Sequence, residues 1–86
     1  MKMKYKIEIL PLADYFVVAV KDKETAELKE SFTLNESGAD MLKLFCQNKD
    51  VATVAREMSD IYDIPLDVIT KDVEKFAEKL MKKCLM

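Results

Sequence analysis

The sequence predicts an α+β domain in which three strands precede three helices. Up to residue 34 the chain is made of alternating or continuous β-prone segments, whereas beyond it apolar residues recur at helical spacing. Strands grouped before helices, with no internal repeat, are typical of an α+β fold and not of a doubly wound one. At 86 residues the chain has room for one core, so a single domain spanning 1–86 is expected.

The first two strands are expected at residues 4–10 and 15–20. The first alternates between apolar and charged side chains, as a half-buried strand requires, and Pro11 is expected to end it. The second is a continuous run of β-branched and aromatic residues. Such a run is typical of the central strand of a small sheet that is covered on at least one face.

The third strand is expected at residues 27–34. Leu28, Phe32 and Leu34 are predicted to share its apolar face, which the charged Glu30 interrupts. An inward charge of this kind is common on edge strands, where it deters uncontrolled pairing with other chains. We therefore expect the third strand at an edge of the sheet.

Helical periodicity accounts for the rest of the chain. Asn35 and Ser37 are both good N-cap residues for the first helix, and Asp40 completes a Ser-x-x-Asp capping pattern. Asp50 is a candidate cap for the second helix, which Pro65 should end because the residue before proline avoids the helical region. The three helices are expected at residues 37–46, 50–62 and 66–83.

Composition argues against an enzyme and against a metal or cofactor site. The chain has no histidine, no nucleophile elbow and no glycine-rich phosphate loop. Cys46 and Cys84 are isolated, so both are interpreted as reduced thiols, with Cys46 expected in the core. The aromatic residues are also expected in the core: Tyr15, Phe16, Phe32, Phe45, Tyr62 and Phe76.

Charge and hydropathy narrow the partners and the location. The net charge is −2, with acids and bases interspersed, so binding through bulk electrostatics is disfavoured and nucleic acid with it. The longest apolar run, residues 15–20, is far shorter than the roughly 20 residues that cross a bilayer. No signal peptide is recognised, and a cytoplasmic protein without membrane contact is expected.

Five segments carry a resemblance to a known family. They are Leu34-Asn35-x-x-Gly38-Ala39, Leu42 to Phe45, Val51-x-x-Val54-Ala55, Tyr62 and Asp72-Val73-x-x-Phe76-x-x-x-Leu80. In this order and spacing, the chain from Tyr15 onward resembles the coenzyme PQQ synthesis protein D family, also called precursor-peptide recognition elements. It departs from the family at Leu42, where members often carry Trp, and at Cys84-Leu85-Met86, where members often have Gly before apolar residues.

The resemblance implies a winged helix-turn-helix-like domain with a three-stranded antiparallel sheet followed by three helices. It also implies a function, since members bind the leader segment of a ribosomally made precursor peptide. They present it to a radical S-adenosylmethionine enzyme or to another modifying enzyme, and the leader adds to the third strand and lies against the third helix. The implied pathway makes either PQQ or another modified peptide.

Carried onto this sequence, the resemblance implies a peptide-binding site on two elements. Backbone groups of residues 29–33 would fix the register of the leader, Phe32 or Phe76 would form an apolar pocket, and charged residues of the last helix would select side chains. The full set is Leu28, Lys29, Glu30, Ser31, Phe32 and Thr33 on the strand, with Val68, Asp72, Lys75, Phe76 and Lys79 on the helix.

Two other functions stay open from the sequence. A winged helix that binds DNA is the first, although the last two helices mix acids with lysines and carry only one arginine, Arg56. A structural subunit that pairs through its exposed strand edge is the second, and at most a weak or strand-swapped homodimer is expected.

Overall fold

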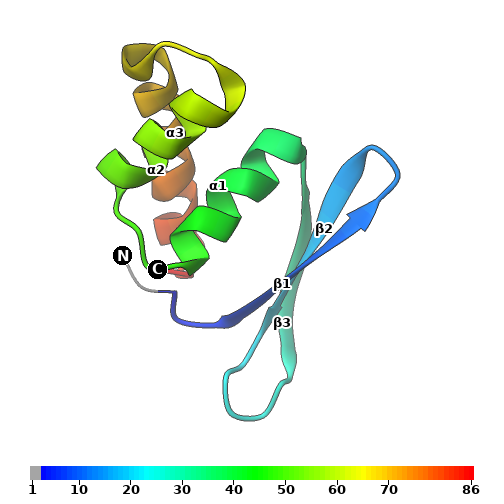
Figure 1. Ribbon diagram of the computed structural model, residues 1–86. Coiled ribbons are helices and arrows are strands. Elements are labelled where there is room, and N and C mark those ends of the chain that lie inside the picture. Colours follow the sequence, from blue (N-terminus) through cyan, green and yellow to red (C-terminus); the bar gives the residue numbers. More distant parts are fainter. Residues whose placement is uncertain (1–2) are drawn as a thin grey trace.

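Residues 3–86 are described by the computed structural model, and they form a sheet followed by a helical layer (Figure 1). The predicted α+β class, with three antiparallel strands before three helices, is confirmed. α1 lies across one face of the sheet, and α2 and α3 pack against each other beyond it. The elements are β1 (Lys6–Leu12), β2 (Tyr15–Lys21), β3 (Leu28–Leu34), α1 (Glu36–Cys46), α2 (Val51–Tyr62) and α3 (Leu66–Lys82).

The sheet has the order β1-β2-β3, so β2 is central and β3 lies at an edge, as its charge pattern predicted. Val18 and Val20 of β2 are fully buried against the helices. Their neighbours across the sheet are Ile9 and Ile7 on β1, and Phe32 and Glu30 on β3. The inner face of the sheet is therefore apolar except at Glu30.

β1 does not end at Pro11, as the sequence suggested, but continues to Leu12. Pro11 pairs with Phe16 of β2 inside the ladder. Proline is tolerated there because β1 is the other edge strand, where a missing N–H can face solvent and leave the ladder intact. Leu12 and Tyr15 then close a two-residue turn in which Ala13 has a φ of 54°.

A register shift in β3 corrects the expected position of Leu28. Val20 pairs with Glu30, but the next residue of β2, Lys21, pairs with Leu28, so Lys29 is the extra residue of a bulge. Leu28 therefore lies on the outer face of the sheet, opposite Phe32, and is 57% exposed. The single inserted residue therefore places the Leu28 side chain on the face of the sheet opposite to that of Phe32.

Capping residues fix the ends of α1 and α2. Asn35 caps α1, its side chain accepting a hydrogen bond from the Gly38 N–H at 2.8 Å, so the helix begins before Ser37. Asp40 does not complete a capping box; it accepts a hydrogen bond of 2.5 Å from the Tyr62 hydroxyl, which joins α1 to the end of α2. Asp50 caps α2 as predicted, through the Thr53 N–H.

α3 ends in a turn that cysteine adopts in place of glycine. Cys84 has a φ of 61°, its N–H donates to the Met81 carbonyl and the Leu85 N–H donates to the Leu80 carbonyl, each at 3.0 Å. This pair of bonds is the Schellman motif, which usually places glycine at the left-handed position. Leu85 is then buried, and its carbonyl accepts a 2.7 Å hydrogen bond from the Lys4 N–H.

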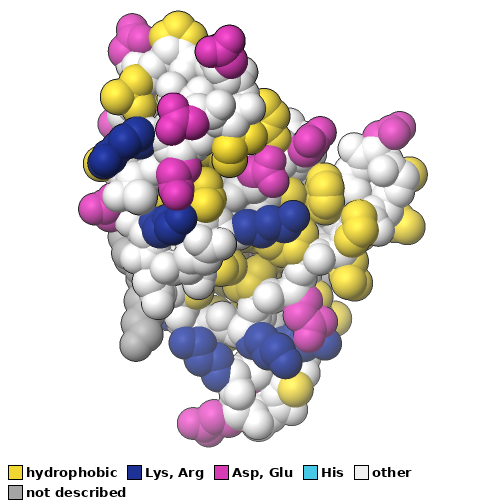
Figure 2. All heavy atoms as spheres, in the orientation of Figure 1, with side chains coloured by type: hydrophobic (Ala, Val, Ile, Leu, Met, Phe, Trp, Pro, Cys, Tyr) yellow, Lys and Arg dark blue, Asp and Glu magenta, His cyan; other side chains and the backbone are white. Residues whose placement is uncertain are grey.

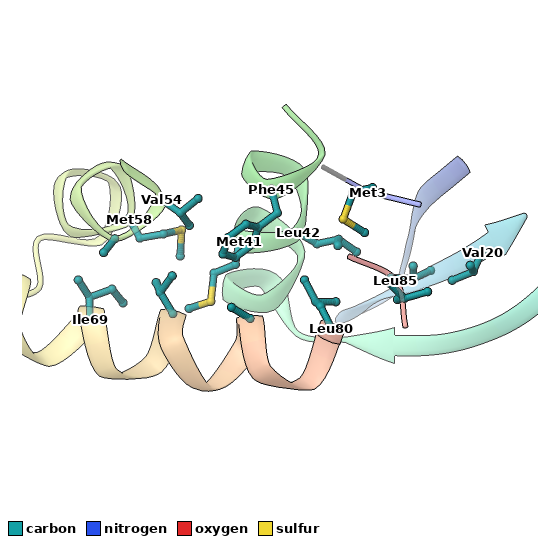
Figure 3. Close-up of a cluster of buried hydrophobic side chains, with 14 residues drawn as sticks. Met3, Val20, Met41, Leu42, Phe45, Val54, Met58, Ile69, Leu80 and Leu85 are labelled. Atoms are coloured by element: carbon teal, nitrogen blue, oxygen red, sulfur yellow. The ribbon is translucent and has the colours of Figure 1, made fainter. Parts of the chain in front are cut away.

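The core joins the two layers (Figure 3). Leu42 and Phe45 of α1 lie between Val54 and Met58 of α2, the α3 side chains, and the sheet. Phe45 is fully buried, and its ring stacks on that of Phe76 with the ring centroids 6.4 Å apart. Leu42, at the position where a larger ring occurs in the resembled family, is fully buried in this cluster.

Three residues expected in the core lie outside its cluster: Cys46, Tyr15 and Phe16, of which Phe16 is half-buried beside the Lys43 ammonium. Cys46 is exposed at the end of α1, although partial burial raises the pKa of its thiol. Tyr15 is 42% exposed near the β1–β2 turn, beside the exposed Leu10 and Leu12, and Figure 2 shows apolar side chains on this hairpin. The hairpin projects beyond the helical layer (Figure 1), which is consistent with the exposure of these three side chains. Within residues 3–86, no helix has the length and apolar character that crossing a bilayer requires.

Candidate functional site

The strand half of the predicted site is an open edge. β3 pairs with β2 on one side, and within residues 3–86 no strand pairs with its other side. An edge strand carries backbone N–H and C=O groups that its own sheet leaves unused. These groups can hydrogen-bond an incoming extended chain.

The side chains of β3 divide between the two faces of the sheet. Phe32 and Glu30 point to the helical side and are half-buried, whereas Lys29, Ser31 and Thr33 are exposed. Leu28 is exposed on the outer face beyond the bulge. Only two of the six predicted strand residues, Glu30 and Phe32, therefore present their side chains toward the helices.

Lys83, just after α3, reaches back to this strand. Its ammonium group lies 4.8 Å from the centre of the Phe32 ring and 2.8 Å from Glu30 Oε1. This contact was not predicted, and it explains how an inward-facing carboxylate is accommodated beside the buried Val20. Both side chains of the pair remain more than a third exposed, so the ion pair contributes little to stability.

The helix half of the site is a hollow between α1 and α3. Its volume is about 260 Å³, and it is lined by Asn35, Ser37, Gly38, Met41, Asp72, Lys75, Phe76 and Lys79. Four of the five predicted helix residues therefore line one cavity. Val68 does not line it; it lies exposed one turn before Asp72.

The α1 wall of the hollow was not predicted. Asn35 and Ser37 entered the sequence analysis as capping residues, and Asn35 also as part of a family motif, but neither was assigned to a binding site. Gly38 was the available signal, since it is the one glycine of the chain. A Cβ added there would lie 3.1 Å from Asn35 Oδ1 and 3.3 Å from Leu34 Cδ2, so the small residue keeps this wall close to β3.

The hollow combines an apolar floor with charged walls. Met41 is nearly buried, and half-buried Phe76 stacks on Phe45 behind it. Lys75 and Lys79 are exposed at the rim, and in residues 3–86 neither ammonium group has a carboxylate oxygen within 4.0 Å. A cavity of this kind accommodates an apolar side chain with an anionic neighbour.

A second hollow of about 330 Å³ lies beside β1, at the C-terminal end of α1. Met3, Tyr5, Ile7, Lys23, Cys46 and Asn48 line it. The Lys23 ammonium is held by the Met3 carbonyl at 2.9 Å. It is larger than the hollow between α1 and α3, and none of the predicted site residues lines it.

The described residues offer no metal centre. Across residues 3–86 no three histidine, cysteine, aspartate or glutamate side chains are close enough to hold an ion together.

The largest resolved change in acidity is at Tyr62, whose hydrogen bond to Asp40 raises the pKa of the phenol to about 12. A phenol so held is a structural donor between two helices.

Small domains with an open strand edge beside a helix-lined hollow can accept an extended chain along that edge. Residues 18–86 match the family described as coenzyme PQQ synthesis protein D (PqqD), and the chain belongs to this family. A comparison with curated proteins found no match.

The fold is shared with a solved structure described as "TbiB1 in Complex with the TbiA(beta) Leader Peptide". The TM-score is 0.72 at 19% sequence identity, and the alignment covers 99% of this chain and 93% of that chain. At this identity the likeness establishes the architecture, which extends over both the sheet and the helical layer.

Proposed function

We propose that this protein is a non-catalytic peptide chaperone that binds the leader segment of a ribosomally made precursor peptide. The leader adds as a fourth strand beside β3, and its inward side chains enter the hollow against α3. The observation that carries the proposal is the open β3 edge next to the hollow of Met41 and Phe76. Membership of the PqqD family and the leader complex of the structural relative support it.

Binding energy in this arrangement comes from two sources. Backbone groups of residues 29–33 supply register-fixing hydrogen bonds, and the hollow supplies selectivity for every second leader residue. Phe32 and Phe76 line the apolar part, whereas Asp72, Lys75 and Lys79 read charge. Val68, exposed on α3 before the hollow, and Leu28, beyond the bulge, contribute only where the leader extends past these ends.

The bound leader is delivered to a modifying enzyme, and a radical S-adenosylmethionine enzyme is the partner proposed. A leader held as a strand on β3 leaves the segment to be modified outside the groove, free to enter another active site. The absence of histidine leaves the usual nucleophilic and general-base arrangements without their central residue. The chemistry is therefore assigned to the partner enzyme.

The test is binding of a fluorescein-labelled synthetic peptide from the leader of a short reading frame beside the gene, measured by fluorescence anisotropy. A scrambled peptide is the control. Ser31→Pro, with Ser31→Ala as its matched control and circular dichroism to verify the fold, should weaken binding by blocking the strand. Unchanged affinity in a folded Ser31→Pro variant contradicts the placement on β3.

A scan of the peptide backbone tests strand addition without altering the protein. Leader peptides N-methylated at one residue each should lose affinity at alternate positions, by about fivefold for each lost hydrogen bond. A uniform response along the peptide contradicts strand addition. Saturable binding to a DNA duplex at low salt, or a mass that rises with concentration in light scattering, would instead favour the DNA-binding or self-associating alternative.

A further inference from the structure

The rim of the hollow has a definite charge order along α3. Asp72 lies one turn before Phe76, whereas Lys75 and Lys79 lie one turn apart on the same face of the helix. In residues 3–86, none of these three groups has an oppositely charged partner within 4.0 Å. The order of these lining residues along α3 is therefore Asp72, Lys75, Phe76 and Lys79, so the hollow has one carboxylate at its Asp72 end and ammonium groups before and after Phe76.

Other lysines near the strand are already engaged. Lys83 holds Glu30 at 2.8 Å and covers the Phe32 ring, and Lys29 lies 3.7 Å from a Glu27 oxygen. Lys43 lies over Phe16, 5.4 Å from the ring centre. Lys75 and Lys79 thus differ from Lys83, Lys29 and Lys43, because a ligand in the hollow can meet their charge without displacing another contact.

The spacing of a strand matches the spacing of these groups. Inward side chains of an added strand recur every second residue, about 6.6 Å apart, and one turn of a helix rises about 5.4 Å. One inward side chain can lie over Phe76 and Met41 while the next, about 6.6 Å away, stays within reach of the long side chains of Lys75 and Lys79, which flank Phe76 along the helix. An acidic side chain at the Asp72 end would instead be repelled.

We infer that the groove selects leader peptides in which an acidic residue lies two positions from a large apolar residue. The apolar side chain occupies the hollow between Met41 and Phe76, and the carboxylate lies within reach of Lys75 and Lys79. This inference rests on the proposed leader binding and adds to it the chemical class of the leader.

The experiment is selection of peptides of about 12 residues from a random display library on the immobilised full chain. Three proteins are compared: the parent chain, Lys75→Glu/Lys79→Glu, and the control Lys71→Glu/Lys82→Glu. The control pair has the same change in net charge on exposed positions of the same helix, outside the hollow and without ion pairs in residues 3–86. Circular dichroism verifies that all three are folded.

The parent chain and the control should both enrich an acidic residue two positions from an apolar one, and Lys75→Glu/Lys79→Glu should enrich a basic residue there. In anisotropy, changing that acidic residue of a selected peptide to its amide should weaken binding to the parent about three- to tenfold, because exposed ion pairs contribute modestly. The difference should shrink at high salt.

Two other outcomes overturn the inference in distinguishable ways. If peptides are enriched without an acidic preference, or the control changes the preference as strongly as Lys75→Glu/Lys79→Glu, the charge rule is wrong and peptide binding stands. If no peptide is enriched on any of the three proteins, peptide binding fails and the inference fails with it.

Discussion

Replacing Cys84 with glycine should stabilise the protein. Cys84 holds a φ of 61° at the end of α3, in the left-handed region that any residue with a Cβ adopts at a free-energy cost of about 1–2 kcal/mol. Glycine removes this strain but gains more freedom in the unfolded chain, which offsets about 0.4–1 kcal/mol. The net gain expected for Cys84→Gly is roughly 0.5–1 kcal/mol, or a rise in Tm of about 2–8 °C for a domain of this size.

The assay is thermal and urea unfolding in the presence of a reductant, followed by far-ultraviolet circular dichroism. Cys84→Ala is the matched control, because it removes the thiol and keeps the Cβ. Cys84→Gly should raise the urea midpoint at an unchanged slope, whereas Cys84→Ala should leave it near that of the parent. Equal stabilisation by alanine and glycine would refute the argument from backbone strain.

Three further changes test other contacts. Tyr62→Phe should destabilise the fold by about 1 kcal/mol through loss of the hydrogen bond to Asp40. Because that hydrogen bond raises the pKa of Tyr62 to about 12, the parent should lose stability between about pH 10 and 12, and the variant should lose less. The same dependence of stability on alkaline pH in both proteins contradicts this. Asp50→Asn keeps a capping side chain but should lose less stability in acid than the parent. The cap hydrogen bonds lower the pKa of Asp50, so the stability that its carboxylate contributes is lost as the pH falls through that pKa. Equal acid unfolding curves for the two proteins would contradict this. Phe76→Leu should weaken leader binding while reducing stability by about 0.5–1.5 kcal/mol through loss of the Phe45 stack; full leader affinity would place the peptide elsewhere.

The sequence was most informative where hydrophobic pattern alone decides structure. β2 is a β-prone run that is buried at Val18 and Val20, and the α3 face that points inward is the one its period predicts. The four helix residues that line the hollow were named from the family resemblance, and they share a region of α3 because residues one turn apart share a face. Whether they bind a leader stays a prediction.

Predictions from the sequence were wrong where the position of a side chain depends on one inserted residue or on a contact between distant parts of the chain. A single bulge residue, Lys29, moved Leu28 to the opposite face, and no local pattern announces a bulge. Asp40 fits a capping pattern equally well, but its partner is Tyr62, 22 residues away. The α1 wall of the hollow could not be read from capping residues, since a cavity depends on how two helices meet.

The hydrogen bond between Lys4 and Leu85 brings the two ends of the described chain together. A domain whose entry and exit points coincide can be spliced into a surface loop of another protein without stretching either junction. The same fold is thus suited both to an independent domain and to a module inserted in a longer polypeptide. In the inserted form the effective concentration of a peptide bound at the proposed groove would be set by linker length, so a low affinity for the peptide would be enough for binding.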